Sequence, residues 1–170
     1  MVMLMEIVKA NFNPIFKEAN KTKKRYRTMK GSAGSGKSVN VAQDYILKLG
    51  DMKYKGGNLL VVKKSEATHK YSTYAELTGA INRIYGKCVN KYWTMKLSPL
   101  EITNKVTGNS IIFRGVNDAK QREKLKSINF PNGKLTWIWC EEATELMESD
   151  VDILDDRLRG ILANLNLYIK

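Results

Sequence analysis

The sequence has 170 residues, of which 43% are hydrophobic and 27% charged, a composition typical of a globular protein with one α/β core. No apolar run approaches the ~20 residues that a membrane-spanning helix requires, and the opening residues do not form a signal peptide. We therefore expect no membrane association. The two cysteines, Cys88 and Cys140, have no metal-binding or disulfide-framework spacing, which indicates a reducing, intracellular setting.

The net charge of +12 is unevenly distributed. Residues 1–134 contain 26 lysines and arginines against 9 acidic residues, whereas residues 135–170 contain 3 against 8. Clustered positive charge attracts nucleic acid at long range, but the same excess can simply keep a protein soluble. The densest basic run, "KTKKRYR" from Lys21 to Arg27, is either a phosphate-contacting patch or a solvated approach to the next strand.

The first half of the chain alternates predicted strands and helices. "RYRTMKG" predicts a strand that leads into a glycine-rich loop, and apolar residues at 3–4–3 spacing predict a helix from Val39 that ends before Gly50. "NLLVVKK" predicts a buried strand. Apolar positions at 4–3–4–3–4 spacing then predict one long helix over 67–85, in which His69 lies at the surface.

The second half predicts a β insertion and a return to the α/β pattern. Short β-type runs over 92–115 indicate antiparallel strands or a hairpin, and the polar segment 118–127 indicates a helical turn or loop. "LTWIWC" predicts a second buried strand. Apolar spacing from Met147 to Leu165 predicts a helix, and "LNLYIK" the start of another strand. The expected fold is α/β, with a mostly parallel central sheet flanked by helices and a β-hairpin insertion.

The glycine-rich loop fits the pattern G-x-x-x-x-G-K-[ST]. Its glycines allow backbone N–H groups to surround a phosphate, and the following helix N-terminus adds positive potential. Lys37 is expected to bind the β- and γ-phosphates and Ser38 to place its hydroxyl on Mg²⁺. The alternative is a merely flexible loop. The predicted nucleotide-binding residues are Gly31, Ser32, Ala33, Gly34, Ser35, Gly36, Lys37 and Ser38.

Two adjacent acids, Glu141 and Glu142, follow the second buried strand. Because successive strand side chains point to opposite sides, one carboxylate can serve the metal and the other a nucleophilic water. We assign Glu141 to Mg²⁺ and Glu142 to the general base, with Lys37 as the second catalytic residue. The alternative is that both glutamates cap the helix that follows.

These segments, with "SIIFRGVNDAKQREKLKS", "WCEEATEL" and "DDRLRG", resemble in sequence and order the ATPase domain of phage terminase large subunits, from about Phe12 to Gly160. The resemblance implies an ASCE-type P-loop ATPase that uses ATP and Mg²⁺ to package double-stranded DNA into a procapsid. It also implies a portal protein and a small terminase subunit as partners, and a homo-oligomeric ring on the portal. The implied location is the host cytoplasm, outside the mature virion.

The resemblance further implies that residues 1–170 are a single, partial ATPase domain, without the later coupling strand and without the nuclease domain of the family. Two alternatives stay open, namely another nucleic-acid-translocating P-loop ATPase and a nucleotide-binding fragment without turnover. The resemblance also suggests that "FNPIF" and Tyr26 lie near the adenine, although Phe12 and Phe16 equally suit a core.

The glycine loop contains no arginine, so charge stabilisation needs another cation. Each candidate is alternatively an ordinary surface charge or salt bridge. Trp93, Trp137 and Trp139 are expected in the core, with DNA stacking an option for Trp93 only. The acids from Asp150 to Asp156 are expected on a largely solvent-facing side of their helix. The candidate cations are Arg122, Lys124, Lys126, Arg157 and Arg159.

Overall fold

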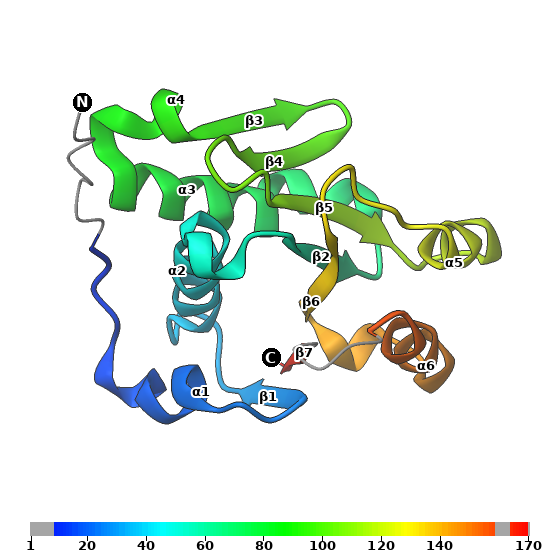
Figure 1. Cartoon of the computed structure of the whole chain (residues 1–170). Coiled ribbons are helices and arrows are strands. Elements are labelled where there is room, and N and C mark those ends of the chain that lie inside the picture. Colours follow the sequence, from blue (N-terminus) through cyan, green and yellow to red (C-terminus); the bar gives the residue numbers. More distant parts are fainter. Residues whose placement is uncertain (1–8, 159–163, 170) are drawn as a thin grey trace.

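The computed structural model of the chain describes residues 9–158 and 164–169, and these form one mixed sheet between two layers of helices (Figure 1). The sheet has the strand order β1-β7-β6-β2-β5-β4-β3. The strands are β1 (Tyr26–Lys30), β2 (Gly57–Lys63), β3 (Trp93–Leu97), β4 (Leu100–Asn104), β5 (Ser110–Gly115), β6 (Lys134–Cys140) and β7 (Asn164–Ile169).

Helices cover both faces of the sheet, with α2 and α3 on one side and α5 and α6 on the other (Figure 1). The α-helices are α1 (Lys17–Lys21), α2 (Lys37–Gly50), α3 (Thr73–Tyr85), α4 (Val89–Tyr92), α5 (Ala119–Lys126) and α6 (Glu148–Arg157). The 3-10 helices are η1 (Pro14–Phe16), η2 (Met52–Tyr54), η3 (Glu66–Tyr71), η4 (Gly86–Cys88) and η5 (Ala143–Glu145). None of the helices in the described ranges is long and apolar enough to span a membrane.

The sheet has a parallel part and an antiparallel part. Strands β1, β7, β6, β2 and β5 run parallel, whereas β3, β4 and β5 are joined as an antiparallel meander. Every residue of β2 is buried, because helices cover both of its faces. The predicted parallel sheet with a hairpin insertion is therefore confirmed.

Alternate residues of the central strands feed two separate cores. Trp137 and Trp139 of β6 pack with α2 and α3, whereas Ile138 and Cys140 pack with α5 and α6. Trp139 has no exposed surface and Trp93 only 2%, so all three tryptophans are core residues as predicted. The suggestion that DNA stacks on Trp93 is wrong, because the ring lies inside the core that includes Trp137 and Trp139.

The predicted helix over 67–85 is wrong in its first half. The chain forms η3, breaks at Ser72 and only then begins α3. The Ser72 hydroxyl donates to the Thr68 carbonyl oxygen and its N–H to the His69 carbonyl oxygen, local hydrogen bonds that compete with a continuous helix. Tyr71, one of the positions that make up the apolar spacing, is 82% exposed.

The predicted helix beyond Glu145 is also shorter than its apolar spacing indicated. Helix α6 ends at Arg157, and Leu165 belongs to strand β7 instead. The strand predicted from "LNLYIK" is confirmed, since β7 lies in parallel between β1 and β6. Sheet pairing on both sides fixes this segment as a strand, whatever its apolar spacing.

His69, predicted at the surface, has no exposed surface. Its Nε2 lies 2.9 Å from the Arg114 carbonyl oxygen, which can only accept, so this nitrogen carries the proton. Its Nδ1 then accepts from the Thr73 hydroxyl at 2.7 Å. Burial lowers the pKa of His69 to about 4, because the charged ring loses its contact with water, and the positive charge of Lys63 lowers the pKa further. The hydrogen bond to the Arg114 carbonyl oxygen and the negative charge of Glu66 raise the pKa, but by less.

This buried histidine predicts acid sensitivity. The unfolded chain takes up the proton near pH 6.5, whereas the folded chain resists it until about pH 4. Stability is therefore complete above pH 6.5 and falls below it, by about 2 kcal/mol at pH 5. Urea unfolding at pH 5 and pH 7.5 measures this loss. In His69→Gln the loss should shrink markedly relative to the parent, and an equal loss in both proteins would contradict a role for His69.

Candidate nucleotide-binding site

The glycine-rich loop connects the end of β1 to the start of α2, at the carboxyl ends of the parallel strands. Gly34 and Gly36 have φ angles of 75° and 80°, which favour glycine strongly. A Cβ atom on Gly31 would lie 3.3 Å from Lys37 Nζ, so a side chain there would crowd the ammonium group. The loop is thus a tight backbone turn around Lys37.

The N-terminus of α2 is open to a ligand. Its N-cap, Gly36, has no side chain with which to accept from the first backbone N–H groups of the helix. Those donors have no partners within the helix itself, and the helix dipole adds positive potential at the same place. An uncapped helix N-terminus behind a glycine turn is suited to bind phosphate.

Lys37 is 8% exposed and lies within the loop. Its ammonium group donates to the carbonyl oxygens of Gly31 at 2.5 Å and Ser32 at 3.0 Å, and to Ser35 Oγ at 2.8 Å. The three donors of the ammonium group therefore have three acceptors in the same loop. A phosphate oxygen that binds Lys37 would therefore replace one of these acceptors.

Ser38 and Glu141 meet across 103 positions of sequence. Ser38 Oγ donates to Glu141 Oε1 at 3.0 Å, and Trp139 Nε1 donates to Glu141 Oε2 at 2.9 Å. Glu141 is only 7% exposed, so these two contacts fix its carboxylate. A hydroxyl and a carboxylate side by side are the hard oxygen ligands that Mg²⁺ prefers, and the pair fits that ion.

Glu142 points elsewhere and has unusual backbone geometry. Its φ of 56° makes it the only residue other than glycine with positive φ in the described part of the chain. Its Oε2 lies 3.1 Å from Lys63 Nζ, at the end of β2. The two glutamates diverge as expected, but for a different reason. Strand β6 ends at Cys140, and a left-handed residue rather than strand pleating turns the second carboxylate aside.

Comparisons with known proteins agree with this geometry. A family model described as phage terminase large subunit matches residues 23–169. The chain belongs to the phage terminase large subunit family. The large terminase subunit of Bacillus phage SPP1 is 32% identical over 149 residues, which cover 85% of this chain and 33% of that protein. The chain thus spans about a third of the length of this terminase.

Solved structures show the same fold. The HK97 bacteriophage large terminase matches with a TM-score of 0.70 and 8% identity, over 94% of this chain and 33% of that one. The large terminase from the thermophilic bacteriophage D6E matches with a TM-score of 0.67 and 17% identity, over 89% and 34%. A structure of the D6E protein in complex with ADP matches with a TM-score of 0.60 and 17% identity, over 84% and 33%. The fold is that of the terminase ATPase domains, a P-loop NTPase fold.

Three of the five cations considered for charge stabilisation in this terminase chain have partners within it. Arg122 forms an ion pair with Asp150, and Arg157 Nη2 donates to the Ile128 carbonyl oxygen at 2.8 Å. Lys126 pairs with Glu123, Lys124 is exposed, and Arg159 lies outside the described residues.

The solvent-facing placement of Asp150 is wrong, since the residue has no exposed surface. Burial would raise the pKa of its carboxyl, but the Arg122 hydrogen bond and charge outweigh burial and lower that pKa.

The residues considered for adenine contact are split. Phe16 is a core residue, yet its ring lies 3.8 Å from where a Cβ of Gly36 would be, so it borders the loop. Phe12 is half-buried. Tyr26 donates its hydroxyl to Asp155 Oδ1 at 2.6 Å and is 49% exposed. Phe16 alone of the three is shown next to the glycine loop.

Sequence reasoning missed two residues of this terminase site, Lys63 and Trp139. Val62 and Cys140 are register partners on β2 and β6, so the lysine that ends β2 lies beside the acids that follow β6. The sequence signal for Lys63 is the lysine that ends "NLLVVK". Placing it at the site required knowing that β2 and β6 are neighbours in the sheet. Trp139 was assigned to the core correctly, without its hydrogen bond to Glu141.

Proposed function

We propose that the chain is the ATP-hydrolysing part of a terminase large subunit and powers the packaging of double-stranded viral DNA. One observation carries the proposal. Ser38 after the glycine loop and Glu141 after β6 lie within hydrogen-bond distance, with Glu142 next in the chain. The nucleotide complexes of the D6E terminase, with ADP and with ATP-γ-S, support nucleotide binding on this fold.

Each residue has a specific role in this proposal. The loop amides and Lys37 bind the phosphate chain, and Ser38 and Glu141 hold Mg²⁺. The ion, when bound, neutralises charge on the phosphate oxygens. Glu142 accepts a proton from the attacking water, and its partner Lys63 holds that carboxylate in place. Both glutamates stay on one end of the sheet because the ends of β2 and β6 are in register.

The remaining assignments follow from family membership and from the share of the relatives that the chain spans. We propose that residues 1–170 are one partial ATPase domain and that the nuclease domain of the family lies outside them. Assembly as a ring on a portal protein, contact with a small terminase subunit and action in the host cytoplasm belong to the same proposal.

A specific observation favours a second candidate, a nucleotide-binding chain without turnover. Glu142 is already paired with Lys63, and the donors of Lys37 already have acceptors in the loop. In this second candidate, both groups have to exchange partners before hydrolysis. If a DNA contact or a neighbouring subunit drives that exchange, the chain by itself binds ATP and does not hydrolyse it.

ATP binding and ATP hydrolysis by the purified chain, with and without double-stranded DNA, test the proposal. Binding with DNA-stimulated release of phosphate supports the complete proposal. Binding without release, under both conditions, supports the second candidate. The absence of ATP binding in a folded chain would contradict both.

Replacing Lys37 with alanine should weaken ATP binding by about 10–100-fold, the usual cost of losing hydrogen bonds to a charged group. Titration with a fluorescent ATP analogue measures the change. Lys30→Ala is the matched control, because Lys30 is exposed and only one residue before the loop. Equal affinities of the two variants would show that the glycine loop is not the phosphate site.

A further inference from the structure

The end of the sheet opposite the nucleotide site carries a group of exposed lysines. Here α2 ends at Gly50 and strands β2 and β6 begin, and three loops lie together: 51–56, 86–92 and 105–109. We name this region the basic end surface. Its lysines are Lys53, Lys55, Lys87, Lys91, Lys105 and Lys134, and all six are exposed.

Hydrogen bonds hold the loops of the basic end surface together. The Thr107 hydroxyl and the Asn109 side-chain amide both donate to the Leu49 carbonyl oxygen, at 2.7 and 3.1 Å. The Lys105 N–H donates to the Tyr92 carbonyl oxygen at 2.7 Å, and the Gly56 N–H to Asn109 Oδ1 at 2.8 Å. The lysines therefore project from a fixed backbone rather than from independent loops.

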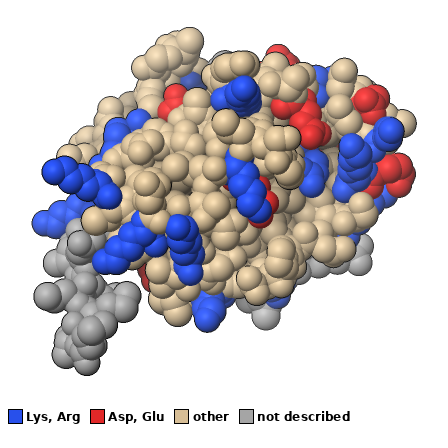
Figure 2. Space-filling view, turned by 90° about the horizontal axis from the view of Figure 1, so that it is seen from above, with Lys and Arg blue, Asp and Glu red and all other residues tan. Residues whose placement is uncertain are grey.

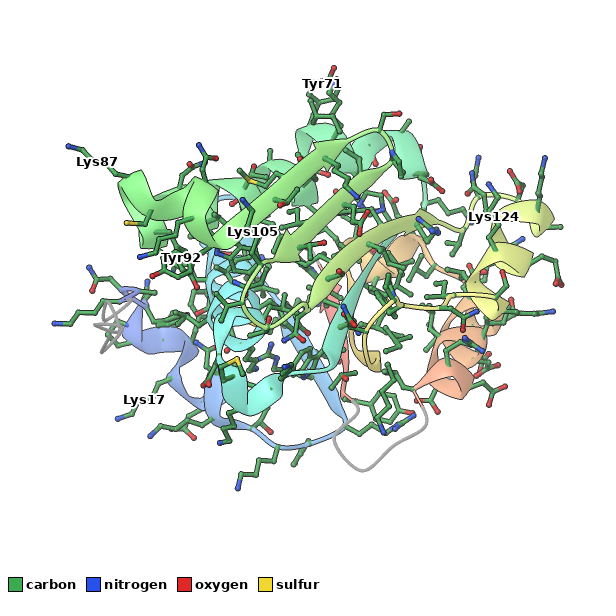
Figure 3. The ribbon with its side chains drawn as sticks, turned by 45° about the horizontal axis from the view of Figure 1, so that its top comes forward. Lys17, Tyr71, Lys87, Tyr92, Lys105 and Lys124 are labelled. Atoms are coloured by element: carbon green, nitrogen blue, oxygen red, sulfur yellow. The ribbon has the colours of Figure 1, made fainter. Side chains whose placement is uncertain are left out.

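The charge of this surface is nearly uncompensated. The three loops contain one acidic residue, Asp51, and residues 102–117 contain none. Among the described residues, no carboxylate forms a salt bridge with Lys53, Lys55, Lys87, Lys105 or Lys134. Figure 2, a view from above Figure 1, shows several basic side chains on the side away from α5, and basic and acidic side chains together near α5. Figure 3 shows Lys87 pointing away from the ribbon, whereas the exposed Lys105 donates from its Nζ to the Asn90 carbonyl oxygen at 2.6 Å.

The basic run from Lys21 to Arg27 is different, although it is denser in sequence. Arg25 pairs with Asp155 and Arg27 with Asp44, so its two arginines are engaged within the fold. Three exposed lysines remain there, Lys21, Lys23 and Lys24. The geometry points to the basic end surface, and not to this run, as the part of the chain that contacts the phosphate backbone of double-stranded DNA.

The inference rests on the proposed function, because that function supplies the DNA. Lysines are compact charges that contact phosphates without reading bases, which suits a motor that must bind any sequence. The nucleotide site lies at the other end of α2, so DNA and ATP do not compete for the same residues. Helix α2 connects them directly, with Lys37 at its start and the Leu49 carbonyl oxygen bound to the lysine-bearing loop at its end.

The test compares two triple variants that remove equal charge. One changes Lys53, Lys87 and Lys105 to glutamine, and the control changes Lys21, Lys23 and Lys24 to glutamine. Binding to a labelled duplex of about 30 base pairs is followed by fluorescence anisotropy from ~50 to ~200 mM salt. ATP-analogue binding and the thermal midpoint are measured on the same samples, so that a folding defect is seen directly.

We expect the first variant to bind DNA at least ~10-fold more weakly at low salt, with a log–log salt slope shallower by about 2–3. The control should change much less, and the corresponding three-arginine variant should keep the parental affinity. Equal losses in the two glutamine variants, a larger loss in the control, or no DNA binding by the parent would overturn the inference. Failure of the parent to bind ATP would instead overturn the proposed function.

Discussion

Replacing Glu142 with glutamine is expected to slow ATP hydrolysis by about 10²–10⁴-fold, while ATP binding stays near the parental level. Glutamine keeps the size of the side chain but cannot accept the proton of the attacking water. In the proposed site, the phosphate and metal contacts come from other residues, Lys37, Ser38 and Glu141, so binding should not depend on this carboxylate. Phosphate release and binding of an ATP analogue, measured in parallel with double-stranded DNA present, separate the two effects.

Glu145→Gln is the matched control, since Glu145 is exposed and three residues further along the chain. It should leave hydrolysis unchanged. Hydrolysis by the Glu142 variant at the parental rate would refute the general-base assignment. A parallel loss of binding and hydrolysis would show instead that Glu142 positions the nucleotide. Lys63→Met should slow hydrolysis while ATP binding stays near the parental level, as expected of a residue that holds the Glu142 carboxylate in place.

The second large effect is on stability, at the ion pair between Arg122 of α5 and Asp150 of α6. Asp150→Ala should lower the free energy of unfolding by about 1–3 kcal/mol, because it removes the buried acceptor of hydrogen bonds from Arg122 and from the backbone. The variant also loses the acceptor of the Met147 N–H, at 3.0 Å, at the start of α6. The midpoint of urea unfolding at pH 7 measures this change.

Asp152→Ala on the same helix is the control, since Asp152 is exposed, and it should cost well under 1 kcal/mol. In the double variant Arg122→Met with Asp150→Ala, much of the loss should be recovered, because no unpaired charge then stays in the interface. If Asp150→Ala were as stable as the parent, water would already solvate the Arg122 guanidinium and the ion pair would add no stability.

The parts of the site that could be predicted are those whose structure depends on residues close together in the sequence. The loop from Gly31 to Ser38 has a conformation dictated by its own glycines, and the strand before Glu141 is recognisable from its apolar run. The fold class followed from the order of such local signals. The individual site assignments remain predictions, although the structure brings Ser38 and Glu141 together as they require.

What the sequence did not predict depends on partners far along the chain. The burial of His69 requires the Arg114 carbonyl oxygen on β5, and that of Asp150 requires Arg122 on α5. Apolar spacing placed Tyr71 and Leu165 in helices, because a helical period can arise by chance where local hydrogen bonds or sheet pairing decide the structure. The pairing of Lys63 with Glu142 likewise required the neighbourhood of β2 and β6.

The position of β7 has a consequence for the order in which the sheet can form while the chain is being synthesised. Strand β1 joins the sheet only through β7, its sole strand partner among the described residues. A ribosome synthesises β1 and the glycine loop early, but their place in the sheet exists only after residues 164–169 have emerged. Strand β1 therefore gains its place in the sheet late in translation, although α2 can already pack on Trp137 and Trp139 of β6 before that point.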